Sequence, residues 1–115
     1  MEFLGYQIIA DLYGCDSEVL KEASRIEALM LEAAEKSKMT IVSSTFHQFN
    51  PHGVSGAVII SESHLAIHTW PEHNYAAVDL FTCGDVIDAQ TALDILSKGL
   101  GCEHISVTEM RRGKR

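Results

Sequence analysis

A serine between two strand-like runs could give this chain a reactive group that no encoded side chain carries. Ser63 follows Glu62 and lies between the apolar runs 57–60 (AVII) and 65–67 (LAI). Attack of the Ser63 hydroxyl on the Glu62 carbonyl would convert that amide into an ester. Elimination and hydrolysis would then leave a ketone, a pyruvoyl group, where Ser63 was. Such a ketone can condense with an amine and accept electrons when carbon dioxide leaves, as pyridoxal phosphate does elsewhere.

Five short motifs, in this order and spacing, closely resemble the short, single-repeat, prokaryotic S-adenosylmethionine decarboxylase proenzymes. The motifs are 43–47 (SSTFH), 53–56 (GVSG), 61–64 (SESH), 67–72 (IHTWPE) and 75–84 (YAAVDLFTCG). The resemblance implies cleavage between Glu62 and Ser63 into chains 1–62 and 63–115. It also implies a pyruvoyl cofactor formed from Ser63, with no metal and no pyridoxal phosphate, and decarboxylation of S-adenosylmethionine for spermidine synthesis.

The same resemblance assigns roles to three more side chains. It makes Ser55 and His68 assistants in cleavage, and an imidazole suits proton removal near neutral pH. The glycines at 53 and 56 allow close backbone approach around Ser55. Cys83 becomes the acid that protonates the substrate carbon, which a protonated thiol can do. The alternatives are a turn hydroxyl for Ser55 and a small buried hydrophobe for Cys83.

Three residues near the centre in sequence are expected to bind the substrate, and the resemblance implies this role for Phe49 and Trp70. Phe49 and Trp70 offer flat aromatic faces for adenine and the sulfonium, although either could be core or interface packing. The Glu72 carboxylate could accept bonds from two ribose hydroxyls, or it could be a solvated turn residue. His73 has no assigned role. Asp79, a charge within an apolar strand, is expected to be structural.

Bulk properties limit the functional classes. A chain of 115 residues is expected to be one domain, 1–115. The net charge of -7 argues against a nucleic-acid partner, and the basic cluster 111–115 (RRGKR) is predicted to be a solvated tail. No apolar run suits a membrane span and no secretory leader is evident. Three cysteines without C-x-x-C spacing favour a reducing, cytoplasmic location.

Periodicity and punctuation predict the order β-α-β-β-β-β-α-β. The expected strands are 4–13, 40–49, 56–61, 64–70, 74–82 and 102–110. Asp16 is expected to cap a helix that continues to about Lys36, and Asp88 a second helix that ends near Gly99.

The expected fold is α+β, a two-layer sandwich in which a mainly antiparallel sheet has two helices on one face. The loops between the middle strands are too short for parallel crossovers. These strands are apolar on both faces, whereas a sheet with one solvated face would alternate. A second copy is the simplest cover for the remaining face, which predicts an αββα homodimer of cleaved protomers.

Three other functions compete with this one. A metal hydrolase is disfavoured because His64 and His68, four apart on a strand, are roughly 13 Å apart, too far to share one zinc ion. The same pyruvoyl scaffold could decarboxylate another amino acid, such as ornithine or arginine. A non-catalytic homologue would need an inert Ser63, His68 or Cys83, and all three residues are present.

Overall fold

The computed structural model describes residues 3–61, 63–83 and 88–114. Glu62, on one side of the expected cleavage bond, and residues 84–87, after Cys83, lie outside the described residues. The elements are β1 (Phe3–Tyr13), α1 (Ser17–Leu20), α2 (Ala23–Lys36), β2 (Ile41–Gln48), β3 (Val54–Ile60), β4 (Ser63–Trp70), the 3-10 turn η1 (Pro71–His73), β5 (Tyr75–Thr82), α3 (Ala89–Gly99) and β6 (His104–Lys114).

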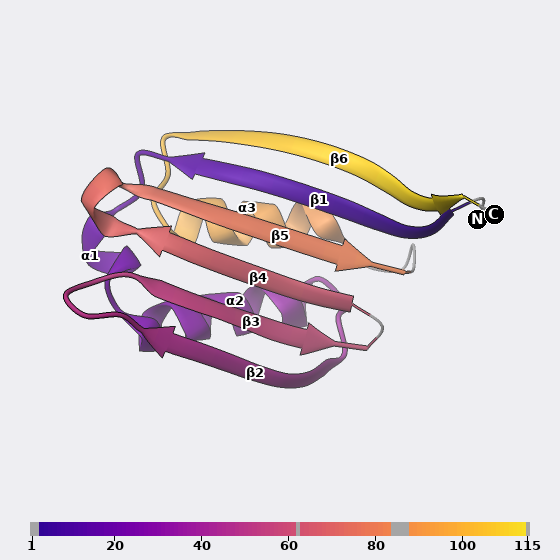
Figure 1. Ribbon diagram of the computed structural model, residues 1–115, viewed down its shortest axis with the longest axis horizontal. Coiled ribbons are helices and arrows are strands. Elements are labelled where there is room, and N and C mark those ends of the chain that lie inside the picture. Colours follow the sequence, from indigo (N-terminus) through magenta and orange to yellow (C-terminus); the bar gives the residue numbers. More distant parts are fainter. Residues whose placement is uncertain (1–2, 62, 84–87, 115) are drawn as a thin grey trace.

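The six strands form one sheet in the order β2-β3-β4-β5-β1-β6, and every neighbouring pair is antiparallel. The middle strands β2 to β5 are neighbours in both sequence and space because short turns join them. In Figure 1, α2 and α3 lie side by side behind the sheet, on one of its faces. This arrangement confirms the predicted α+β class with helices on one face.

The hydrophobic core lies between the sheet and these helices. Alternate residues of the central strands point into it, including Leu12, Val58, Ile67 and Leu80, as period-two geometry requires. From the helices, the fully buried residues include Ile26, Met30 and Leu96. No described helix is long and apolar enough to cross a membrane.

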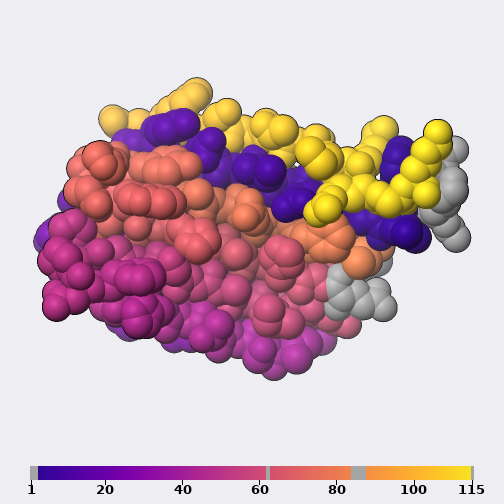
Figure 2. Space-filling model, viewed as in Figure 1, coloured from indigo at the N-terminus to yellow at the C-terminus, as the bar shows by residue number. Residues whose placement is uncertain are grey.

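The opposite side of the sheet, the open face, is not covered by any described element, and Figure 2 shows it from the front. Its residues follow from the strand register, and they include Ile9, Ser55, Ala57, Ile59, Ala66, His68, Trp70, Tyr75, Ala77 and Phe81. Large apolar side chains among them, such as Ile9, Ile59 and Trp70, are exposed. The strands are apolar on both faces, but the helices cover only one of them. A single protomer therefore leaves one apolar face uncovered.

The first helix differs from the prediction, because the chain forms two helices that separate at residues 21–22. Asp16 does cap α1, since its Oδ1 accepts from the Glu18 N–H. The backbone of Glu22 is extended, and the first N–H of α2, that of Ala23, is satisfied by Oε1 of Gln48 on β2 at 2.8 Å. The cap comes from a side chain far away in sequence. The break therefore has no local signal such as a glycine or proline.

The C-terminal residues also differ from the prediction. Instead of forming a tail, residues 111–114 continue β6 and pair with the start of β1. The side chains are exposed, but the Arg111 guanidinium lies 5.6 Å from the Phe3 ring centroid, and Arg112 donates to Oε1 of Gln7 at 2.9 Å. Pairing of β6 with β1 therefore gives a defined strand structure to a basic segment that, from its charge alone, is expected to be a solvated tail.

We expect Leu96→Ala to lower the free energy of unfolding by about 2–5 kcal/mol, because Leu96 is fully buried and its truncation leaves a cavity. The matched control is Leu4→Ala, since Leu4 is 63% exposed and its loss should cost less than about 1 kcal/mol. Denaturant unfolding of both variants at one protein concentration measures the difference. Equal losses would contradict the assigned core.

Candidate active site

A serine–histidine pair lies on the open face near one end of the sheet. Ser55 on β3 and His68 on β4 are directly opposite in the register, and Ser55 Oγ lies 2.8 Å from His68 Nδ1. His47 on β2 is opposite Ser55 on the other side, so the hydroxyl has a histidine on each neighbouring strand. The alternative of a local turn hydroxyl for Ser55 does not fit, because its partner is an imidazole thirteen residues away.

Ser63 and Cys83 lie together at the other end of the central strands. β4 begins at Ser63, which is half-buried and opposite Ile60 of β3. The register pairs His64 with Phe81 of β5, and continuing it by one residue brings Ser63 beside Thr82, next to Cys83. Cys83 follows the end of β5 and is an exposed free thiol. This exposure excludes the alternative of a buried hydrophobe for Cys83.

One protomer does not bring Ser63 to the Ser55–His68 pair. Ser63 and His68 are five residues apart on one strand, which is roughly 17 Å at about 3.3 Å per residue. They also belong to opposite faces, because Ser63 shares its parity with the buried Leu65 and Ile67. Side-chain rotation cannot close this distance within one chain.

The expected substrate residues gather at the same end as the Ser55–His68 pair. Phe49 is 47% exposed and packs edge-on against His47, with ring centroids 4.6 Å apart. Trp70 is 40% exposed and stacks on Tyr75, with centroids 5.2 Å apart. Neither ring is core packing. Glu72, in η1, has its carboxylate Oε1 3.4 Å from His52 Nε2.

The aromatic side chains form a row across four strands that sequence reasoning missed. From Trp70 on β4 the row continues through Tyr75 on β5 and Tyr13 on β1 to His104 on β6. A shallow hollow of about 340 Å³ is lined by Tyr13, Trp70, His73 and Tyr75. The signal in the sequence was weak, because aromatic residues at strand ends show neither the register nor which face they share.

Near the end of the sheet that carries the Ser55–His68 pair, two side chains have raised pKa values. The Tyr75 hydroxyl donates to Asp11, and this hydrogen bond, with some desolvation, raises the pKa of Tyr75 to about 12. Desolvation raises the pKa of the Cys15 thiol to about 11, and the nearby Cys102 adds to the shift. The buried Cys15 donates to the Leu12 carbonyl, which fits the structural role expected for it.

Asp79 lies half-buried on the open face, in register with Ile9 of β1 and Ala66 of β4. It has no ion pair among the residues that the structure describes. Its carboxylate therefore faces the surface that any covering partner would occupy.

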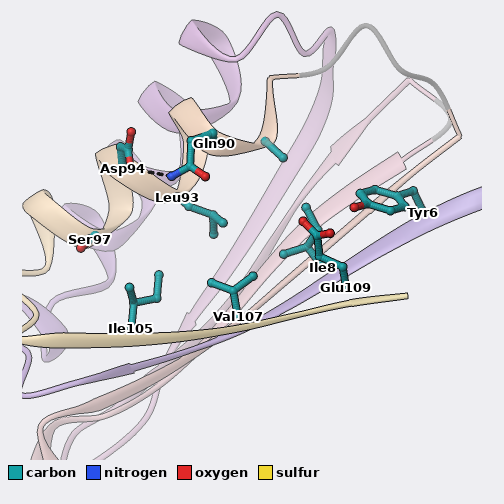
Figure 3. Close-up of a pocket in the computed structure, with 10 residues that line it drawn as sticks. Tyr6, Ile8, Gln90, Leu93, Asp94, Ser97, Ile105, Val107 and Glu109 are labelled. Atoms are coloured by element: carbon teal, nitrogen blue, oxygen red, sulfur yellow. Dashed lines mark hydrogen bonds between the residues drawn. The ribbon is translucent and has the colours of Figure 1, made fainter. Parts of the chain in front are cut away.

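A second hollow, of about 610 Å³, lies on the helix side of the sheet, between α3 and the β1–β6 edge. Figure 3 shows Asp94 and Gln90 on α3 across from Glu109 on β6, with Gln90 donating to Asp94 at 2.9 Å. None of the expected site residues lines it, so its size does not make it the active site. Within residues 3–61, 63–83 and 88–114, no group of three or more His, Cys, Asp or Glu side chains is arranged to hold a metal ion.

The chain matches known proteins over nearly its whole length. A family model described as S-adenosylmethionine decarboxylase matches residues 6–113. The S-adenosylmethionine decarboxylase proenzyme of Acidithiobacillus ferrooxidans is 54% identical over 114 residues, which cover 99% of this chain and 86% of that protein. The proenzyme of the same name from Thermotoga maritima is 53% identical over 114 residues, with 99% and 88% covered.

Solved structures agree with these sequence matches. The crystal structure of the adenosylmethionine decarboxylase from Aquifex aeolicus superposes with a TM-score of 0.92 at 38% identity, covering 100% of this chain and 95% of that one. An AdoMetDC from Trypanosoma brucei shares the fold at a TM-score of 0.68 and 20% identity, over 44% of its longer chain. The chain therefore belongs to the S-adenosylmethionine decarboxylase family.

Proposed function

We propose that this protein is a self-processing, pyruvoyl-dependent decarboxylase that converts S-adenosylmethionine to its decarboxylated form and carbon dioxide. The observation that carries the proposal is that Ser63, at the start of β4, lies beside the end of β5, where the exposed free thiol of Cys83 follows Thr82. The relatives of this protein are named S-adenosylmethionine decarboxylase proenzymes, and a proenzyme is a chain that must mature before it acts. The free cysteines also suit a reducing cytoplasm.

The position of Ser63 suits conversion to a pyruvoyl group. It is the first residue of β4, so cleavage before it opens the connection between two strands and leaves both strand interiors intact. The new ends stay together because β3 and β4 remain paired from Ser55–His68 to Ile60–Ser63. Fragments 1–62 and 63–115 therefore remain one folded domain. When formed, the pyruvoyl ketone supplies the electron sink for loss of carbon dioxide.

In this proposal Cys83 delivers a proton to the substrate beside that group. It lies one residue beyond Thr82, the position next to Ser63, and its thiol is exposed at the strand end. A protonated thiol is neutral and can donate its proton to a developing carbanion. Cys15 is buried beneath the sheet and is not available for this role.

The Ser55–His68 pair comes from a second copy of the chain. An isologous dimer that packs open face on open face, with its two-fold axis across the strands, lays one end of the sheet over the opposite end of the partner sheet. The strand ends that carry Ser63 and Cys83 of one protomer then lie over the partner's Ser55 and His68. Ser63 is a strand-end residue that becomes a chain terminus on cleavage, so it can turn from the helix side of the sheet toward them. The exposed Ile9 and Ile59 become buried in the same contact.

In this dimer the substrate lies between the two sheets. The Phe49 and Trp70 rings and the Glu72 carboxylate come from the protomer that supplies the Ser55–His68 pair, because all three share its end of the sheet. The aromatic faces attract the flat adenine and the sulfonium, and Glu72 accepts hydrogen bonds from the ribose hydroxyls. His68 and Ser55 assist proton transfer during cleavage.

Ser63→Ala should remain a full-length chain without activity, because it lacks the attacking hydroxyl. The purified native protein should give two masses, those of 1–62 and 63–115, and borohydride should add two hydrogens to the second. Intact-mass spectrometry of both proteins checks this. A Ser63→Ala chain that still splits before residue 63 would rule out the mechanism.

Cys83→Ala should still cleave, because its thiol is not needed for the acyl shift, but decarboxylation should fall about 10²- to 10⁴-fold, the usual contribution of a general acid. Release of carbon dioxide from labelled S-adenosylmethionine measures the rate. The same assay with labelled ornithine and with labelled arginine measures substrate choice. The control is Cys102→Ala, a half-buried thiol away from the site, which should retain activity. Faster turnover of ornithine or arginine would replace the proposed substrate.

Co-expression tests the contribution of the partner. A His68→Ala chain should not cleave alone, but it should cleave when paired with Ser63→Ala, which brings an intact Ser55–His68 pair. The mixed dimer contains one complete site and one lacking both groups. Differently tagged chains and intact-mass spectrometry reveal which chain splits. If His68→Ala never splits in the mixed dimer, or splits fully alone, the partner does not supply the pair.

A further inference from the structure

The turn at residues 49–53 is held firmly against the end of β4. Its closing bond is donated by the Phe49 N–H to the Gly53 carbonyl at 2.8 Å, and the Gln48 amide donates to the same oxygen. Gly53 has a φ of 109°, and a Cβ there would lie 3.3 Å from the Thr69 carbonyl oxygen. Only glycine suits this conformation and close approach. The backbone next to His52 is therefore constrained.

The η1 turn that carries Glu72 is also fixed. Pro71 is buried, the Asn74 N–H donates to the Pro71 carbonyl at 3.2 Å, and the Asn74 side chain donates to the Cys15 carbonyl at 3.0 Å. The Glu72 side chain itself projects from this turn and is 47% exposed. A half-exposed carboxylate on a fixed backbone can adopt several rotamers, so another group is needed to orient it before a ligand arrives.

His52 is the group that meets this carboxylate. Its Nε2 lies 3.4 Å from Glu72 Oε1, so the two form an ion pair when the ring is protonated. Among the residues that the structure describes, only Oε1 of Glu72 has a side-chain partner, and a carboxylate has about four acceptor positions. Oε2 and the remaining lone pair of Oε1 stay available for two hydroxyl donors. The contact also links the turn that bears Phe49 to the turn that follows Trp70.

We propose that His52 is a positioning residue that holds the Glu72 carboxylate in place for the ribose of the nucleoside, an inference that rests on the substrate role proposed above for Glu72. His52 does not touch the reacting carbon, and its effect passes through Glu72. Because the pair is partly exposed, the effect is modest, and it falls on nucleoside affinity with little change in the chemical step.

The experiment measures the dissociation constant of 5′-deoxy-5′-methylthioadenosine with the processed dimer, by calorimetry. This ligand has the nucleoside but no α-amine, so its binding is separate from the chemistry. His52→Phe keeps a ring and removes the donor, and it should weaken binding about twofold to fivefold, the range for a partly exposed pair. His52→Gln, whose Nε2 can take the place of the imidazole Nε2, should restore most of the affinity.

Two further measurements separate positioning from a general structural effect. In a Glu72→Gln background, His52→Phe should cause no further loss, because its effect passes through the carboxylate. With the 2′-deoxy form of the ligand, the loss caused by His52→Phe should become smaller. In turnover assays, His52→Phe should raise KM for S-adenosylmethionine and leave kcat within about twofold.

The outcomes distinguish the two proposals. If Glu72→Gln weakens nucleoside binding but His52→Phe does not, or if the two losses simply add, the positioning role of His52 is wrong and the role of Glu72 stands. If Glu72→Gln binds the nucleoside as the native protein does, the ribose contact itself is wrong, and the inference falls with it. A lower kcat with unchanged KM for His52→Phe would also overturn it.

Discussion

The hydrogen-bonded register of β4 is the constraint on which the candidate site depends. β4 lies in the interior of the sheet, paired with β3 on one side and β5 on the other, so it cannot slide without breaking both ladders. This one strand carries Ser63 at its start, His68 near its end and Trp70 as its last residue. Because an extended strand is rigid on this scale, it separates the proposed cleavage bond from the imidazole that is proposed to assist.

The open face gives a physical reason for a second copy. Its middle carries small residues, with Ala57 directly opposite Ala66 and Ala77 one position along the next strand, while the stacked rings of Tyr13, Tyr75 and Trp70 lie toward one end. Small residues at the centre allow another sheet to approach closely, and the exposed isoleucines on either side would then be buried. A surface of this kind is costly to leave in water. The proposed mechanism gives a separate, chemical reason for a partner, because one protomer does not bring Ser63 to the Ser55–His68 pair.

The end of the sheet that carries the Ser55–His68 pair is also where the helices are attached. The buried Thr69 hydroxyl accepts from the Val54 N–H and donates to the Leu20 carbonyl, each at 2.9 Å, so it joins β3, β4 and α1. Gln48 caps α2 from the same side. These tertiary hydrogen bonds fix the turns that bear Phe49, His52 and Glu72, and a preorganised wall binds a ligand with less ordering cost.

Motif order and periodicity determined the strand count and the antiparallel class, because alternation and short turns are local properties of a chain. The motifs also supplied the residues that are proposed to carry the chemistry. The sequence could not show the break before α2, the pairing of residues 111–114 or the contact between His52 and Glu72, since each depends on a partner far away in sequence. The sequence also did not determine which face of the sheet Ser63 and His68 each occupy. Only the sheet register decided that, because side-chain direction on a strand is set by its neighbours, and the register places the two at opposite ends of one rigid strand.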